Sequence, residues 1–162
     1  PGRVYKADFF GNEFPQREFD AITLMGVIEH VVDPASIIQR THQLLKSEGF
    51  IMLQTPNSGA LLARLLRKYW PPYQPLEHIH LFSEKSLKHL LIDTGFEDIH
   101  ITNHVKRLPV AYVYAQLANF GPEFRKIVAP FYNLLPQAAR NVELPFYIGE
   151  MIVTARKSSA QG

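Results

Sequence analysis

A strand–helix–strand pattern in residues 19–57 constrains the fold of this chain more than any other stretch. Asp20–Leu24 and Phe50–Gln54 are short apolar runs without alternation, which is typical of strands buried on both faces. Between them, Asp33 and Pro34 predict the start of a helix, with Asp33 as its N-cap. Parallel strands joined in this way bind ligands beyond their carboxyl ends. The pattern therefore predicts an α/β sheet with a site in the two loops that follow these strands.

The connecting helix is expected to carry one apolar face and to end just before Gly49. Its apolar residues recur at helical spacing: Ile37, Ile38, Leu44 and Leu45. Lys46 would lie in the last turn, where a cation faces the negative end of the helix dipole. Gly49 would then allow the chain to leave the helix.

Length and composition exclude several classes of protein. A chain of 162 residues is long enough for one domain with a real core. Its formal charge of +2 gives no sign of nucleic-acid binding, and it has no cysteine for disulfides or Cys-ligated metals. No apolar run approaches the roughly 20 residues of a transmembrane helix. We expect a cytoplasmic protein without a transmembrane segment.

Further elements are expected along the chain. A helix over residues 58–68 would bury Leu61, Leu62 and Leu65, and residues 77–82 alternate like a short strand. Ser83 would cap another helix that ends at Gly95, after which Phe96 opens the next strand. The final strand is predicted over Phe146–Ala155, antiparallel to the strand that begins at Phe96.

Three stretches resemble class I S-adenosylmethionine-dependent methyltransferases, in the branch that contains the ubiquinone O-methyltransferases and other small-molecule methyltransferases. They are FDAITLMGVIEHVVDP at 19–34, LLKSEGFIMLQTPN at 44–57 and HIHLFSEKSLKHLLIDTGFE at 78–97. Their order and spacing extend the resemblance over Val4–Thr102, and Tyr147–Arg156 suits the last strand of that fold. The resemblance implies methyl transfer from S-adenosylmethionine to a small-molecule acceptor, at oxygen.

One departure from the family is as informative as the matches. The family's Gly-rich cofactor loop has no counterpart, because no two glycines in this chain are separated by a single residue. The acidic residue that ends the family's second strand is also missing. We therefore expect an incomplete Rossmann-like fold over residues 1–157, with strands 3 to 7 and flanking helices but without strands 1 and 2. Residues 158–162 would form a frayed tail, and the cofactor site would be incomplete.

Four residues match positions that contact S-adenosylmethionine in the resembling enzymes: Asp8, Phe9, Met25 and Gly26. Asp8 would accept a hydrogen bond from the adenine amino group, following a strand over Val4–Ala7. Met25 offers a soft thioether that suits an adenine or sulfonium surface. Asp8 could instead cap the turn that follows it, and Met25 could be an ordinary core residue.

Glu29 and His30 are the candidate catalytic residues. A carboxylate beside an imidazole can act as orienter and base for the deprotonation of a hydroxyl group. The same pair could ligate a hard divalent ion, or could brace the loop through hydrogen bonds. The ubiquinone O-methyltransferases carry a further Glu where this chain has Gly26. We therefore expect no metal.

Acceptor binding is expected in the loop and strand that follow residue 68. Tyr69, Trp70 and Tyr73 lie in a segment with three prolines, which cannot form a regular element. They would form the walls of the acceptor site, with cation–π support for the sulfonium. His78 and His80 would contact the acceptor, and either one or His30 would accept its proton.

An apolar insertion over residues 104–145 precedes the last strand. Val110, Val113, Tyr114 and Leu117 share one helical face, and a second helix would run from Pro122 to Pro136 with Phe124, Ile127, Val128 and Phe131 on its face. We expect a lid over the acceptor. A dimerisation surface is a second interpretation, and a peripheral membrane helix edged by Arg125 and Lys126 is a third.

The alternative to an enzyme is a non-catalytic methyltransferase-like module for interaction or dimerisation. Without strands 1 and 2, the strand at Asp20–Leu24 would be a bare edge, and such edges pair readily. Either the strand at Val4–Ala7 or a second copy of the chain would cover it. A homo-oligomer formed through this edge or through the insertion is therefore expected, as is, more weakly, a separate cofactor-binding partner chain.

Overall fold

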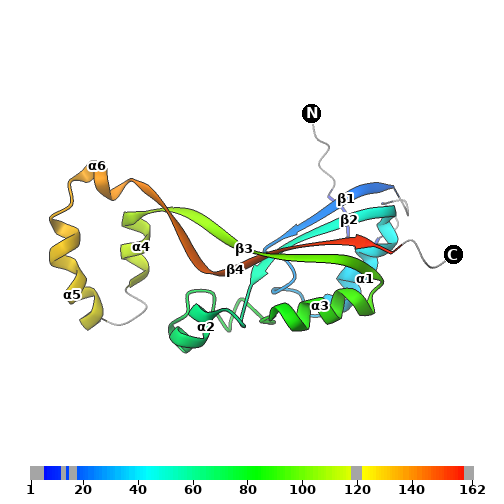
Figure 1. The fold of residues 1–162 in the computed structure, drawn as a ribbon, viewed down its shortest axis with the longest axis horizontal. Helices are drawn as coiled ribbons and strands as arrows, with labels where there is room; N and C mark the ends of the chain where they lie inside the picture. The colour runs from blue at the N-terminus through cyan, green and yellow to red at the C-terminus, as the bar shows by residue number, and fades with distance from the viewer. Residues whose placement is uncertain (1–5, 12–13, 15–17, 118–121, 159–162) are drawn as a thin grey trace.

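The protein contains a four-stranded mixed sheet with the strand order β1-β2-β4-β3 (Figure 1). It is described by a computed structural model over residues 6–11, 14, 18–117 and 122–158. The strands are β1 (Phe19–Met25), β2 (Leu45–Pro56), β3 (Phe96–Pro109) and β4 (Glu143–Lys157). β1 runs parallel to β2, and β4 runs antiparallel to both of its neighbours. The expected mixed α/β sheet is confirmed in this part of the chain, including the antiparallel last strand.

Two helices cover one face of the sheet, and the others follow β2 or lie at the far end of the β3–β4 pair. α1 (Pro34–Leu44) and α3 (Glu84–Asp93) pack on a single core cluster with the sheet. The rest are α2 (Leu61–Leu66), the short 3₁₀ helix η1 (Arg67–Tyr69), α4 (Val110–Gln116), α5 (Pro122–Asn133) and α6 (Gln137–Arg140). Figure 1 shows α4, α5 and α6 at the tip of a long β3–β4 hairpin, away from the core. No helix of the described part is long and apolar enough to cross a membrane.

The core lies between that helical layer and alternate residues of the strands. Ile51 and Leu53 of β2 and Val153 of β4 are completely buried, whereas their neighbours Phe50 and Ile152 are only partly covered. Each fully buried aliphatic side chain contributes about 1.5–3 kcal/mol of transfer free energy. The expectation that Asp20–Leu24 and Phe50–Gln54 are buried on both faces is wrong for the described residues, because in β1 only Leu24 is buried and in β2 burial alternates from Gly49 to Gln54.

The start of α1 is confirmed, but its predicted end is wrong. The carboxylate of Asp33 accepts a hydrogen bond from the backbone N–H of Ser36 at 3.1 Å, and Pro34 is the first helical residue. The helix ends at Leu44, so Lys46 and Gly49 belong to β2 and not to the last turn and its stop.

The helix ends early because its last carbonyl groups and its next residues find tertiary partners. The Nζ of Lys157, itself buried, donates to the carbonyl oxygens of His42 and Leu45 at 2.6 and 2.8 Å. Leu45 pairs with Phe19 in the sheet, and Lys46 forms an ion pair with Asp20 of β1 at 2.8 Å. These interactions satisfy the helix end without a glycine.

The segment after β2 differs from its prediction in two ways. The predicted helix over 58–68 shrinks to α2 and η1, and Leu61 and Leu65 of its expected apolar face are about 70% exposed (70% and 69%). Residues 77–82 form no strand, because their backbone groups bond to loops instead: the N–H of His80 donates to Glu29 and the carbonyl of Phe82 accepts from Ser58.

Trp70 holds this segment to the sheet. Its side chain is 3% exposed and packs in a second, smaller cluster with Ala60 and Ala63. The indole N–H donates to the carbonyl oxygen of Ile148 at 2.7 Å. Gly149 beside it has φ +85°, and a Cβ there would lie 2.7 Å from the indole nitrogen. Trp70 is thus a packing residue whose contact requires a glycine in β4.

The insertion between β3 and β4 is helical only at its tip, in α4, α5 and α6. β3 and β4 continue to pair as far as Pro109 and Glu143, so the predicted insertion over 104–145 is too long and the predicted final strand over 146–155 is too short. Val110 begins α4 as expected, and Pro122 begins α5.

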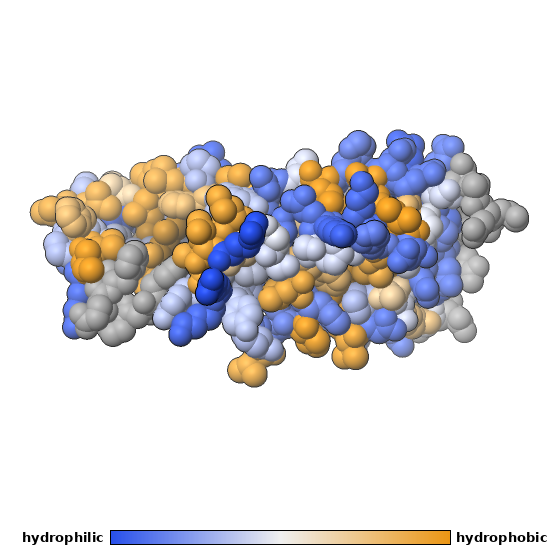
Figure 2. Space-filling view, turned by 60° about the horizontal axis from the view of Figure 1, so that its bottom comes forward, coloured by the Kyte–Doolittle hydropathy of each residue, from blue (hydrophilic) through white to orange (hydrophobic). Residues whose placement is uncertain are grey.

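Aromatic and cation–π contacts hold the tip helices together. Tyr114 of α4 and Tyr132 of α5 stack at 3.8 Å between ring centroids, and Arg140 of α6 lies over the Tyr132 ring. Ile127 and Phe131 of α5 point outward, at 67% and 71% exposure. Figure 2 shows hydrophobic side chains gathered at this end of the molecule.

Several expectations about the N-terminal and C-terminal segments remain predictions. The strand at Val4–Ala7 falls largely outside the described residues, and Lys6 and Ala7 are not in a strand. The side chain of Phe124 and residues 159–162 of the tail are also outside them. Within the described part, β1 pairs only with β2, so its other edge has no strand beside it. The absence of strands 1 and 2 and the covering of this edge by a second copy both stay predictions.

His42 gives the fold a specific acid sensitivity. Burial, followed by the nearby charge of Lys157, lowers the pKa of His42 below its ordinary value. The folded state therefore binds this proton less readily than the unfolded state, and stability is lost as the pH falls from about 7 to about 5. His42→Gln should flatten this loss in urea unfolding curves recorded across that range, while His89→Gln, an exposed change on α3, should not. Equal slopes in both variants would contradict the assignment.

Replacement of Trp70 tests its structural role. Trp70→Phe removes the bond to Ile148 and part of the buried ring, so the free energy of unfolding should fall by about 1–3 kcal/mol. The matched change Tyr73→Phe, at a ring that is 45% exposed, should alter it by less than about 0.5 kcal/mol. Urea denaturation followed by circular dichroism measures both; equal effects would mean that Trp70 does not hold the segment.

Candidate active site

The loop that follows β1 places a buried carboxylate beside a tight turn. Gly26 has φ +63°, and its N–H donates to the carbonyl of Gln54 at the end of β2. Glu29 is 3% exposed and lies close to this turn. Its Oε2 has no hydrogen-bond partner among the described residues. A buried carboxylate oxygen without a partner is costly, so this atom marks a place where a ligand or a proton fits.

His30 and His78 meet at this loop, and Glu77, which accepts a hydrogen bond from His30, lies 47 positions further along the chain. Their ring centroids are 4.8 Å apart. The Nδ1–H of His30 donates to the carbonyl oxygen of Glu77 at 2.7 Å, and the Nδ1–H of His78 donates to that of Pro72. Because a carbonyl oxygen only accepts, each neutral ring carries its proton on Nδ1. The lone pair of each ring is therefore on Nε2.

These two rings and Glu29 converge. One ligand atom from each of Glu29, His30 and His78 lies within 4.8 Å of the others, and the Nε2 of His30 is 4.0 Å from Oε1 of Glu29. Such a group can accept and hold a proton, and it also has the composition of a divalent-metal site. The expectation that no metal binds stays a prediction.

His80 braces the same loop without joining this cluster. Its backbone N–H donates to the carbonyl of Glu29 at 3.1 Å, and its Nε2 lies 3.3 Å from the carbonyl oxygen of Val32. The bracing role that the sequence left open for His30 is thus performed in part by His80. Asp33 at the next helix has its pKa lowered by its bonds with Ser36, so it stays ionised as a cap.

The expected cofactor residues lie at the edge of the sheet where a ligand can reach them. Met25 ends β1 and is 45% exposed. A Cβ at Gly26 would meet only Glu29, so there is space beside this turn. These features and the unpartnered oxygen of Glu29 fit the methionyl or adenosyl part of S-adenosylmethionine.

Asp8 forms a turn in this structure. Its Oδ1 accepts from the N–H of Phe10 at 3.1 Å, and its carbonyl accepts from Gly11. Arg40 of α1 holds the turn by donating to the carbonyls of Phe9 and Gly11. Phe9 packs against the core cluster. The turn-capping alternative for Asp8 is therefore realised, and its second carboxylate oxygen is left for the role that the resemblance implies.

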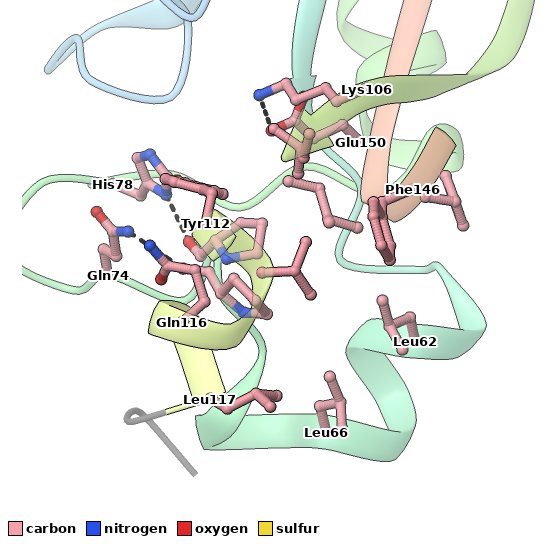
Figure 3. A pocket seen from close by; sticks show the side chains of 16 residues that line it. Leu62, Leu66, Gln74, His78, Lys106, Tyr112, Gln116, Leu117, Phe146 and Glu150 are labelled. Atoms are coloured by element: carbon pink, nitrogen blue, oxygen red, sulfur yellow. Dashed lines mark hydrogen bonds and ion pairs between the residues drawn. The ribbon is translucent and has the colours of Figure 1, made fainter. Parts of the chain in front are cut away.

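An apolar pocket of about 400 Å³ opens beside the histidine pair (Figure 3). Leucines of α2, prolines 71 and 72, one side of α4 and the outer part of β4 form its walls. Its main apolar side chains are Leu62, Leu66, Tyr112, Val113, Phe146 and Ile148. His78 belongs to both the pocket and the histidine pair. This size and lining suit a small, largely apolar molecule.

The aromatic residues expected around the acceptor lie elsewhere. Tyr69 and Tyr73 are exposed, Trp70 is in the small core cluster, and none of the three lines this pocket. The aromatic lining comes instead from Tyr112, Phe146 and Tyr147, which the sequence placed in the insertion and the last strand. α4, which belongs to the expected lid, forms one wall of this pocket, and its role as a lid stays a prediction.

A charged pair, Lys106 and Glu150, lies at one end of the pocket, apart from Gln74, His78 and Gln116. Glu150 accepts from Lys106 at 2.7 Å through Oε1 and from Gln54 at 2.6 Å through Oε2 (Figure 3 shows the ion pair). Burial, followed by Glu84, raises the pKa of Tyr147 in the wall, so its hydroxyl stays protonated at neutral pH. Sequence reasoning missed Lys106 and Glu150, because nothing in the local pattern indicates that they pair across β3 and β4.

Comparison with known proteins identifies the family. The family described as "Methyltransferase domain" matches residues 3–101. Ubiquinone biosynthesis O-methyltransferase of Leptothrix cholodnii is 44% identical over 55 residues, which are 34% of this chain and 23% of that protein. Its counterpart in Glaesserella parasuis is 49% identical over 43 residues, 26% of this chain and 18% of that protein. The matched part thus spans about a quarter of these curated relatives or less.

Solved structures share the fold at low identity. A S-adenosylmethionine-dependent methyltransferase from Thermotoga maritima superposes with a TM-score of 0.58 at 14% identity, covering 94% of this chain and 62% of that one. Another from Archaeoglobus fulgidus gives 0.55 at 18% identity, over 95% and 67%. These likenesses show that the chain shares the fold of these proteins. The chain belongs to the class I S-adenosylmethionine-dependent methyltransferases.

Proposed function

We propose that this protein transfers a methyl group from S-adenosylmethionine to an oxygen of a small, largely apolar acceptor. The acceptor occupies the apolar pocket between α2, α4 and β4. The observation that carries the proposal is the position of His78, which lines the pocket and also contacts His30 in the loop that follows β1. The partial match to ubiquinone biosynthesis O-methyltransferases supports oxygen as the methylated atom.

The cofactor would be held by the residues that end β1 and by the turn before it. Met25 and Gly26 would contact it, with Asp8 and Phe9 on its adenosyl side. When bound, S-adenosylmethionine supplies an electrophilic methyl carbon on a sulfonium centre. The protein's contribution is then to bring the acceptor oxygen in line and to remove its proton.

Proton removal is assigned to the Nε2 of His78. The bond from its Nδ1–H to Pro72 fixes the tautomer, so the lone pair on Nε2 is ready to accept the proton of an acceptor hydroxyl group. His30 and the buried carboxylate of Glu29 would stabilise the resulting imidazolium. The apolar walls exclude water, which strengthens this interaction. Location in the cytoplasm and self-association remain predictions.

Loss of the base should abolish most of the activity. His78→Gln keeps a polar side chain of similar size but removes the basic nitrogen, so kcat should fall by about 10²- to 10⁴-fold. The assay uses the full-length gene product, S-adenosylmethionine with a labelled methyl group and a panel of phenols and catechols. His89→Gln on α3 is the control and should keep full activity. Undiminished turnover by the His78 variant would exclude it as the base.

Metal removal distinguishes the two uses of the cluster. If His78 accepts the proton directly, a chelator should leave turnover unchanged, and added Mg²⁺ or Mn²⁺ should not raise it. Loss of activity with EDTA and recovery with one of these ions would show that Glu29, His30 and His78 act as ligands, and the base would then have to be sought elsewhere.

A further inference from the structure

The polar end of the apolar pocket is a built hydrogen-bonding site. Figure 3 shows Lys106 and Glu150 at one end of a pocket whose opposite walls are leucines. The side chain of Glu150 is 9% exposed and that of Lys106 is 34% exposed. His104 lies opposite Glu150 and Lys106 lies opposite Phe146, with an irregularity in the pairing between them. The ion pair at 2.7 Å spans this irregularity and holds the ammonium group beside the carboxylate.

Each carboxylate oxygen of Glu150 has a donor, whereas Lys106 has an acceptor for only one of its three donors among the described residues. One carboxylate oxygen of Glu150 accepts from Lys106 and the other from Gln54. An ammonium group has three N–H donors, and the described residues supply an acceptor to one of them. The remaining donors of Lys106 lie at the wall of an apolar pocket, where a hydrogen bond to a charged group is strong.

We propose that Lys106 binds an anionic oxygen group of the acceptor, a carboxylate or a phenolate, and that the acceptor is therefore an apolar, ring-sized molecule with one acidic end. Glu150 and Gln54 act as positioning residues that hold the ammonium group at the wall. This inference rests on the proposed function, because it assumes that the pocket receives the acceptor.

Among the residues that line the pocket, Glu150 is the one whose charge opposes this assignment. It would repel an anion and attract an ammonium ligand. However, its oxygens already accept hydrogen bonds of 2.7 and 2.6 Å, and its side chain is 9% exposed against 34% for Lys106, so the ammonium group is the more accessible of the two charges. Ligand charge therefore separates the two interpretations experimentally.

The test measures the binding of three naphthalene probes to the full chain by isothermal titration calorimetry. The probes are 2-naphthoate, 2-naphthamide and 2-naphthylmethylamine, which share one apolar body and carry a negative, neutral and positive end. We expect the naphthoate to bind about tenfold more tightly than the amide, and the amine to bind most weakly. A preference for the amine, or equal affinity for all three, would overturn the inference.

Variants link the preference to Lys106. Lys106→Met should remove the preference for naphthoate while leaving the affinity for the amide within about twofold. Since this change leaves the buried Glu150 unpaired, the double variant Lys106→Met/Glu150→Gln provides a neutral version that is expected to fold and to behave alike. Lys88→Met on α3, outside the pocket, should keep the full preference. Retention of the preference in the double variant would also overturn the inference.

Failure of the proposed function has a different signature. Val113→Trp fills the pocket and should abolish binding of all three probes. If none of the probes binds the unmodified chain, or if Val113→Trp leaves their binding unchanged, the pocket is not the acceptor site, and both proposals fail. If binding is blocked by that variant but does not depend on ligand charge, only the assignment to Lys106 fails.

Discussion

The pairing of β4 with a strand on each side determines where a ligand can bind. β4 pairs with β2 as far as the partners Pro56 and Glu150, and with β3 as far as Glu143 and Pro109. On the N-terminal side of Glu150, over residues 143–149, β4 therefore pairs with β3 but no longer with β2. The pocket opens against this outer part of β4, and α2 and α4 close it. The same end point brings the pocket next to the carboxyl ends of β1 and β2, where the family binds its cofactor.

Local signals in the sequence predicted the elements that depend on local chemistry. Asp33 and Ser83 cap their helices as expected, and Gly95 adopts φ +88° at the end of α3. The parallel β1–α1–β2 unit and the site loop after β1 also follow from apolar runs and caps. These signals act over a few residues, and here the tertiary contacts agree with them.

Tertiary contacts decided the elements that were predicted wrongly. Lys46 and Gly49 look like a helix end, but a cap from Lys157 closes α1 earlier. Residues 77–82 alternate like a strand, yet their backbone bonds to the site loop and to Ser58. The meeting of His30 with His78, and of Lys106 with Glu150, likewise depends on chain segments that are far apart in sequence, which no spacing rule can anticipate.

The length of the β3–β4 hairpin has a mechanical consequence. Over residues 143–149 the described part of β4 pairs only with β3, as a two-stranded ribbon, and its contact with a core cluster is limited to the small cluster around Trp70 that Tyr147 joins. Twisting or flexing such a ribbon disturbs far fewer interactions than deforming the sheet. α4 follows directly on β3 of this ribbon, whereas the segment of α2 is held to the sheet through Trp70. A small rotation of the ribbon end would therefore widen or narrow the gap between α4 and α2. A ligand can thus enter and leave through movement of the ribbon, while the part of the sheet that holds the reacting groups stays rigid.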